Sequence, residues 1–196
     1  WAMSTLENNR EPDRNPGRFI VVDGTFESVS GNTIGLCWCK IPTPAAFVLK
    51  LEWLGWRHED NSSVCFRFPD PTSKSYANAA YLGVHSGFEA QIDELDVPDG
   101  KGIRTTVAIY REDTREDKET PVLQPALDAG QCDELEIRVQ GRTNSVFLND
   151  QRRCVFNNPC AGRGLPSAPG ASSFIGLQTR GGQSRLAFRT TRIKPL

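Results

Sequence analysis

The chain has 196 residues, with 23 Lys and Arg against 24 Asp and Glu, so its formal net charge is -1. This balance excludes a nucleic-acid binder that works through bulk positive charge, because such a domain needs clustered, unpaired cations. No run approaches the ~20 apolar residues that a membrane-spanning helix needs, so we expect no membrane insertion. At this length a core forms without help from disulfides or metal.

The first 17 residues are polar and lack apolar periodicity, which predicts a flexible arm or linker over 1–17. The rest, 18–196, predicts one domain. An arm of this kind is compatible with other domains of a larger chain. The sequence leaves the cellular compartment open.

The six cysteines include no CxxC pair, which disfavours zinc. Cys37 and Cys39 would share one face of a strand and are poorly placed to bridge each other. Cys154 and Cys160 flank a turn and could form a disulfide, although free thiols packed as small hydrophobes are preferred for all six. Free thiols favour a cytoplasmic location, and we expect neither metal nor cofactor.

Short runs rich in Val, Ile, Phe, Thr and Trp follow one another along the chain, separated by Gly, Pro, Asn, Asp or Ser. The runs cover 19–29, 34–40, 47–56, 62–68, 87–94, 105–112, 133–141, 145–150, 152–156, 173–180 and 185–196. No helices alternate with them. The pattern predicts an all-β fold, a jelly-roll sandwich of two antiparallel sheets, with longer connections over 69–86, 95–104 and 111–131.

Alternation along these runs predicts which side chains face the core. In 47–53, Phe47, Leu49, Leu51 and Trp53 share one face. The run 133–141 alternates in the same way. Both runs are therefore expected to be half-buried strands.

The run 87–94 gives the first candidate site. Alternation places Phe88, Ala90 and Ile92 toward the core and Glu89, Gln91 and Asp93 together on the other face, about 6–7 Å apart. Such a row can hold sugar hydroxyls, and paired carboxylates can divide acid and base roles. An ordinary solvent-exposed strand face is the alternative.

The run 62–68 gives the second candidate. Here Val64, Phe66 and Phe68 are expected to face inward, leaving Cys65 and Arg67 on the opposite side. Arg67 could then pair with a carboxylate of the neighbouring row or hold a substrate oxygen. A structural ion pair between strands fits the sequence equally well.

Histidines and exposed aromatic residues complete the candidates. His58 lies in a polar turn and is expected at the surface, whereas His85 precedes the 87–94 run and could contact a substrate. Tyr81, in a long connection, and Tyr110 could stack on sugar rings. A loop anchored by its own aromatic side chains is the alternative for Tyr81.

Taken together, these segments resemble the bacterial family of unknown function DUF1080, also called 3-keto-disaccharide hydrolase-like. The matching segments are DGTFES, FVLKLEW, NSSVCFRF, GFEAQIDE, VAIY, ELEIRVQGRTNSVFLND and FIGLQTRGGQSRLAFRTTRIKPL, in that order. Each is weak alone, but their number, order and spacing identify the chain as a member over about 18–196. The resemblance implies a concanavalin-like jelly roll and allows a periplasmic or secreted location.

The resemblance also implies a function as a glycosidase that hydrolyses 3-keto-disaccharides or eliminates across their bonds. Carried over by position, it puts Arg67, Glu89, Gln91 and Asp93 on a concave carbohydrate-binding sheet, with Tyr110 nearby. Glu89 or Asp93 would be the base and Arg67 would stabilise the enolate oxygen. Gln91 and Tyr110 would bind hydroxyls. The expected ligand is a carbohydrate, and the expected pocket is an open hollow beside Arg67.

The sequence departs from the family pattern at several positions. The family's Gln-x-His-Gly reads Gln178-Thr179-Arg180-Gly181 here, and its Asn-Gly turn reads Asn149-Asp150. Such departures also fit a non-catalytic glycan-binding or recognition module of a larger protein. A protein-interaction sandwich without a sugar site is a third reading.

Overall fold

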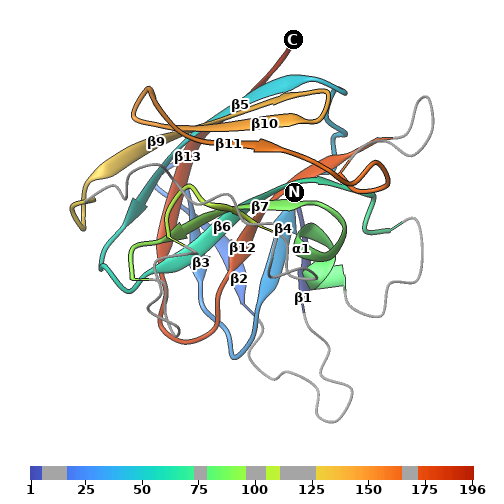
Figure 1. Ribbon diagram of the computed structural model, residues 1–196. Helices are drawn as coiled ribbons and strands as arrows, with labels where there is room; N and C mark the ends of the chain where they lie inside the picture. The colour runs from blue at the N-terminus through green and yellow to red at the C-terminus, as the bar shows by residue number, and fades with distance from the viewer. Residues whose placement is uncertain (6–16, 73–78, 96–104, 111–126, 165–171) are drawn as a thin grey trace.

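In a computed structural model the chain forms two antiparallel sheets packed face to face (Figure 1). The structure describes residues 1–5, 17–72, 79–95, 105–110, 127–164 and 172–196. Sheet A has six strands in the order β1-β4-β12-β6-β7-β8, and sheet B has seven in the order β11-β10-β9-β5-β13-β3-β2. The predicted all-β jelly-roll sandwich is confirmed.

The strands of sheet A are β1 (Ala2–Thr5), β4 (Gly35–Trp38), β6 (Asn61–Phe68), β7 (Phe88–Asp93), β8 (Ile109–Tyr110) and β12 (Phe174–Thr179). Those of sheet B are β2 (Arg18–Val22), β3 (Thr25–Val29), β5 (Phe47–Gly55), β9 (Cys132–Gln140), β10 (Thr143–Leu148), β11 (Gln151–Asn157) and β13 (Leu186–Pro195). A short 3-10 helix η1 (Ala79–Tyr81) leads into helix α1 (Leu82–Ser86).

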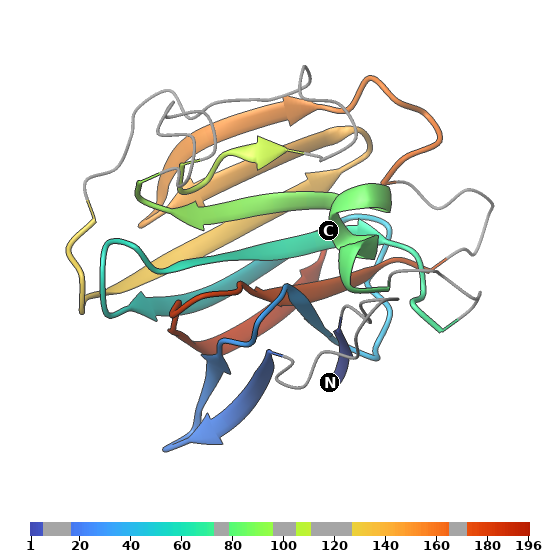
Figure 2. The ribbon, with the colours of Figure 1, turned by 90° about the horizontal axis from the view of Figure 1, so that it is seen from below.

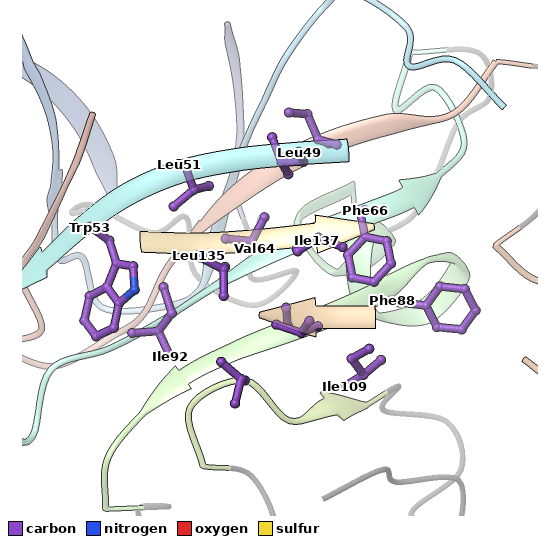
Figure 3. Packing of buried hydrophobic residues seen from close by; sticks show 14 of the residues in the cluster. Leu49, Leu51, Trp53, Val64, Phe66, Phe88, Ile92, Ile109, Leu135 and Ile137 are labelled. Carbon is purple, nitrogen blue, oxygen red and sulfur yellow. The ribbon is translucent and has the colours of Figure 1, made fainter. Parts of the chain in front are cut away.

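The main core lies between the two sheets (Figure 3). Strand β5 shows why: its residues alternate between buried and half-buried positions along its whole length, so Leu49 and Leu51 enter the core while Lys50 faces outward. Leu135 and Ile137 of β9 meet them from the neighbouring strand. The alternation predicted for both strands is therefore confirmed.

Two sequence expectations about the chain's organisation change. Residues 2–5, which the sequence assigns to a flexible N-terminal arm, form β1 and pair antiparallel with β4 at the edge of sheet A. The connection 69–86 is partly helical, since it contains η1 and α1. The connections 95–104 and 111–131 lie mostly outside the described residues.

Helix α1 covers part of the outer face of sheet A, where it packs on β6 and β7 (Figure 2). A second apolar cluster fills this contact and joins Leu82 to Cys65 and Phe68. The approach is close at Gly83, where an added Cβ would stand 2.7 Å from the Cys65 side chain. A glycine is needed there because any side chain would push α1 away from the sheet.

A bulge in β6 corrects the predicted facing of its last residues. Phe66 is opposite Ile175 and Phe68 is opposite Phe174, so Arg67 is one extra residue on β6. Its φ of 58° lies in the left-handed region. Phe68 consequently turns to the outer face instead of facing inward with Phe66, because the extra residue reverses the alternation.

Candidate functional site

A row of polar side chains crosses the outer face of sheet A. It is formed by Asn61 of β6, Glu89, Gln91 and Asp93 of β7, and Gln178 of β12, and is called the polar row below. Residues opposite each other in antiparallel strands share a face, and Asp93 is opposite Asn61 in the register of β6 and β7. The row therefore lies on the face turned away from the main core, as alternation predicted for β7.

Side-chain hydrogen bonds connect the polar row. Gln178 donates through Nε2 to Oε1 of Glu89 at 2.8 Å, across the intervening strand β6. Asn61 donates through Nδ2 to Oδ2 of Asp93 at 2.5 Å. Gln91 donates through Nε2 to Oδ1 of Asn61 at 3.2 Å. Each carboxylate thus accepts from an amide, which orients both groups and the amides that hold them.

The polar row is buried, which differs from the open hollow expected from the sequence. Glu89 is 0% exposed, Gln91 2% and Asp93 3%. The alternative prediction, an ordinary solvent-exposed strand face, is therefore wrong as well. Among the described residues, the acceptor atoms Oε1 of Gln91 and Oε1 of Gln178 are buried without a hydrogen-bond donor. Unsatisfied acceptors at this depth carry a free-energy cost that a ligand hydroxyl can relieve.

Arg67 does not join the polar row. Its guanidinium donates to the main-chain oxygens of Gly164 and Ala45, each at 2.8 Å. Burial lowers the pKa of Arg67. The ion pair expected with Glu89 or Asp93 is replaced by bonds to backbone carbonyls, because the bulge redirects the side chain toward the segments that precede β5 and follow β11.

Cys65 lies beside Glu89 in the register of β6 and β7. Burial, followed by the charge of Glu89, raises the pKa of the Cys65 thiol well above 9.0. A thiol in this state is a poor nucleophile, because the thiolate is the reactive form. Cys65 therefore contributes packing and not chemistry. All six cysteines are free.

The end of β7 is fixed by a second set of polar contacts. Oδ1 of Asp93 accepts a hydrogen bond from the Leu95 amide at 3.1 Å. The Asp93 amide donates to Oγ1 of Thr106, which in turn donates to Glu94 at 2.6 Å. Both oxygens of Asp93 are thus engaged, one by Asn61 and one by Leu95. Such a carboxylate is held in one orientation.

The remaining predicted site residues come from β8 and from the helical segment over sheet A. Tyr110 is opposite Glu89 in the register of β7 and β8. Tyr81 and His85 belong to the helical segment over sheet A, and their rings stack with centroids 5.2 Å apart. His85 is exposed. Within the described ranges, no group of three or more His, Cys, Asp and Glu is arranged to hold a metal ion.

Sequence reasoning missed two members of the polar row. In the sequence Asn61 and Gln178 are only positions within the family motifs, yet they supply the amide donors for Asp93 and Glu89. Alternation does predict which face of its strand each side chain occupies. It does not predict the strand order β12-β6-β7, which brings Gln178 close to a strand 85 or more residues away in sequence.

The sequence family described as the 3-keto-alpha-glucoside-1,2-lyase-like domain matches residues 1–194. No curated protein matches the sequence. Among the described residues, no helix has the length and apolar character to cross a membrane.

Several solved structures share the fold. A candidate glycosyl hydrolase of Parabacteroides distasonis is 22% identical, with a TM-score of 0.66 over 91% of this chain and 90% of that one. A carbohydrate-binding module of Bacillus subtilis is 11% identical, with a TM-score of 0.58 over 91% of both chains. A Bacillus subtilis protein of unknown function with a galectin-like fold is 10% identical, with a TM-score of 0.64 over 99% and 94%.

Proposed function

Because the chain belongs to the family of 3-keto-alpha-glucoside-1,2-lyase-like domains, we propose that it cleaves 3-keto-glycosides at the polar row. One observation carries the proposal: Glu89 and Asp93 lie on one strand, each hydrogen-bonded to an amide side chain, on the face of sheet A away from the core. Two fixed carboxylates with amide groups between them suit both parts of the task, proton transfer and the binding of hydroxyls.

The proposed reaction begins at the carbon next to the keto group. A ketone at C3 acidifies the hydrogen on C2, so a carboxylate can accept that proton while the C–H electron pair forms an enolate. The enolate then re-forms the ketone as the C1–O bond breaks, and the leaving alkoxide takes a proton. Water adds across the C1–C2 double bond, with hydroxide at C1 and a proton at C2. The sum of the steps is hydrolysis.

The two carboxylates are assigned different roles. Asp93 accepts at both oxygens, which suits a group that orients a substrate hydroxyl. Glu89 is assigned as the base, held in place by Gln178.

Binding roles follow from the positions of the other groups. Gln91 and Asn61 would bind ring hydroxyls, and Tyr110, Tyr81 and His85 would contact the sugar from β8 and from the helical segment. The developing enolate would be stabilised by amide N–H groups of the polar row, which are neutral donors. Arg67 is left out of the mechanism, since its guanidinium is bound to backbone oxygens.

A non-catalytic glycan-binding module is the second candidate. The observation that favours it is the engagement of Arg67 away from the polar row: the cation expected to stabilise the enolate is bound to backbone oxygens instead. The structural similarity to a carbohydrate-binding module agrees with this candidate at the level of fold. In this case the polar row would bind a saccharide without turning it over.

Turnover separates the two candidates. Purified protein is mixed with a 3-keto-α-glucoside and the release of aglycone is followed by mass spectrometry. The lyase proposal expects release that falls by at least about 100-fold in Glu89→Gln, in line with the loss of a general base. Glu134→Gln is the matched control, because Glu134 lies on β9 of the other sheet. Binding of the glucoside without release would favour the module.

A further inference from the structure

An opening lined by the connections between β5 and β6 and between β12 and β13 adjoins the polar row at Asn61. It is a groove of about 310 Å³ whose lining includes Asn61, Arg180 and Ser184. Asn61 also holds Asp93 and accepts from Gln91, so it is shared between the groove and the polar row. A ligand group in the groove that contacts Asn61 would therefore touch the side chain that also holds Asp93.

Arg180 is placed to meet such a ligand. It follows the last residue of β12, two positions after Gln178, and alternate residues of an extended chain point to the same face. Arg180 is half-buried. Within the described part of the chain its guanidinium has neither an ion pair nor a hydrogen bond, whereas five donors are available in a fixed plane.

The other charged residues of the groove differ from Arg180. Arg57 is neutralised by Asp60 at 2.9 Å and also donates to the main-chain oxygen of Gln183. Glu59 is exposed at the rim. Arg180 is thus the half-buried cation of the groove that lacks a carboxylate partner among the described residues. A partly desolvated guanidinium gains most from a planar or tetrahedral oxyanion, which it can bind through two N–H groups.

We propose that Arg180 recognises an anionic group, a carboxylate or a sulfate, on the saccharide bound at the polar row. This inference rests on the proposed function and deepens it, since it makes acidic sugars the ligand class. The polar row binds hydroxyls, and the groove binds the charge. Neutral sugars fill the polar row and leave Arg180 without its partner.

Binding of matched small sugars tests the proposal. Dissociation constants are measured by NMR titration for methyl α-glucuronide, for methyl α-glucoside and for methyl α-glucoside 6-sulfate. We expect at least one of the two anionic sugars to bind about tenfold more tightly than the neutral glucoside, the factor expected of a charge-assisted hydrogen bond. Whichever anionic sugar binds more tightly than the neutral glucoside shows whether the site prefers a uronate or a sulfated sugar. The preference should weaken as salt is added.

Three variants sharpen the test. Arg180→Gln should lose the preference and keep the affinity for the neutral glucoside. Arg142→Gln, the same change on an exposed residue in the turn between β9 and β10, should keep the preference. Glu59→Gln should strengthen it, because a rim carboxylate repels an anion.

The outcomes separate this inference from the function on which it rests. Equal binding of neutral and anionic sugars, or a preference retained in Arg180→Gln, would overturn the role of Arg180 and leave the saccharide site standing. Absence of binding for all three sugars would overturn the role of Arg180, whereas the proposed function would fall only if a 3-keto-α-glucoside is also neither bound nor cleaved.

Discussion

Gln178 and Glu89 are joined by a hydrogen bond that spans three strands: Gln178 lies on β12, Glu89 on β7, and β6 runs between them. The contact buries a carboxylate with 0% exposure beside the amide that orients it. It ties the candidate base to the middle of sheet A, so the same bond serves stability and the proposed chemistry.

Removing the amide should therefore destabilise the protein. Gln178→Ala takes a donor from a buried carboxylate, and we expect the free energy of unfolding to fall by about 1–3 kcal/mol. Urea unfolding measures the change. Gln140→Ala, at an exposed position at the end of β9, should change it by less than about 0.5 kcal/mol. Equal midpoints for the two variants would mean that the bond contributes nothing.

Arg67 is expected to be a structural residue. In Arg67→Met the oxygens of Ala45 and Gly164 lose their donor. We expect a loss of about 2–3 kcal/mol in urea unfolding, since bonds from a charged donor are the stronger kind. Turnover per folded molecule should stay within about threefold of the parent protein. A 100-fold fall in kcat with unchanged stability would return Arg67 to the catalytic site.

Sequence patterns predict which face of a strand a side chain occupies better than they predict which residues surround it. Alternation alone placed Leu49 in the core and Glu89 on the opposite face, because a strand's period fixes both. It failed at Arg67, where a bulge puts a non-glycine residue at positive φ without any local signal. Alternation also predicts that Glu89 is accessible to solvent, whereas Glu89 is buried in the structure. Burial depends on what crosses the outer face, such as the short helix that contains Gly83.

Glu94 should make stability depend on pH. Burial raises its pKa above 4.5 in spite of the hydrogen bonds from Thr106 and Leu127. The folded state then holds a proton that the unfolded state has lost, so the free energy of unfolding falls as pH rises from about 4.5 through the raised pKa. Glu94→Gln should flatten this decline and be more stable than the parent protein at neutral pH.

Unfolding at a series of pH values checks this expectation. Glu59→Gln is the control, because its side chain is exposed and the parent slope should persist. A slope that is the same in Glu94→Gln as in the parent protein would contradict a role for Glu94.

The turn between β10 and β11 offers a stabilising change. Asn149 and Asp150 both have positive φ, 49° and 62°, as in the two-residue turns that favour Asn-Gly. Asp150→Gly should relieve the strain of a side chain in the left-handed region and raise the free energy of unfolding by about 0.5–1 kcal/mol. Thermal unfolding measures it. Asp150→Ala keeps a Cβ there and should bring no gain, so an equal gain in both variants would exclude strain as the cause.

The most direct test of the central claim follows hydrogen at C2 of the sugar. A 3-keto-α-glucoside is converted in D₂O and the released sugar is analysed at once by NMR, with the protein-free exchange rate subtracted. Elimination followed by addition of water predicts deuterium at C2 of the product at every turnover, and no product with Glu89→Gln. Product that retains its original hydrogen at C2, or the same labelled product with Glu89→Gln, would contradict proton abstraction by Glu89.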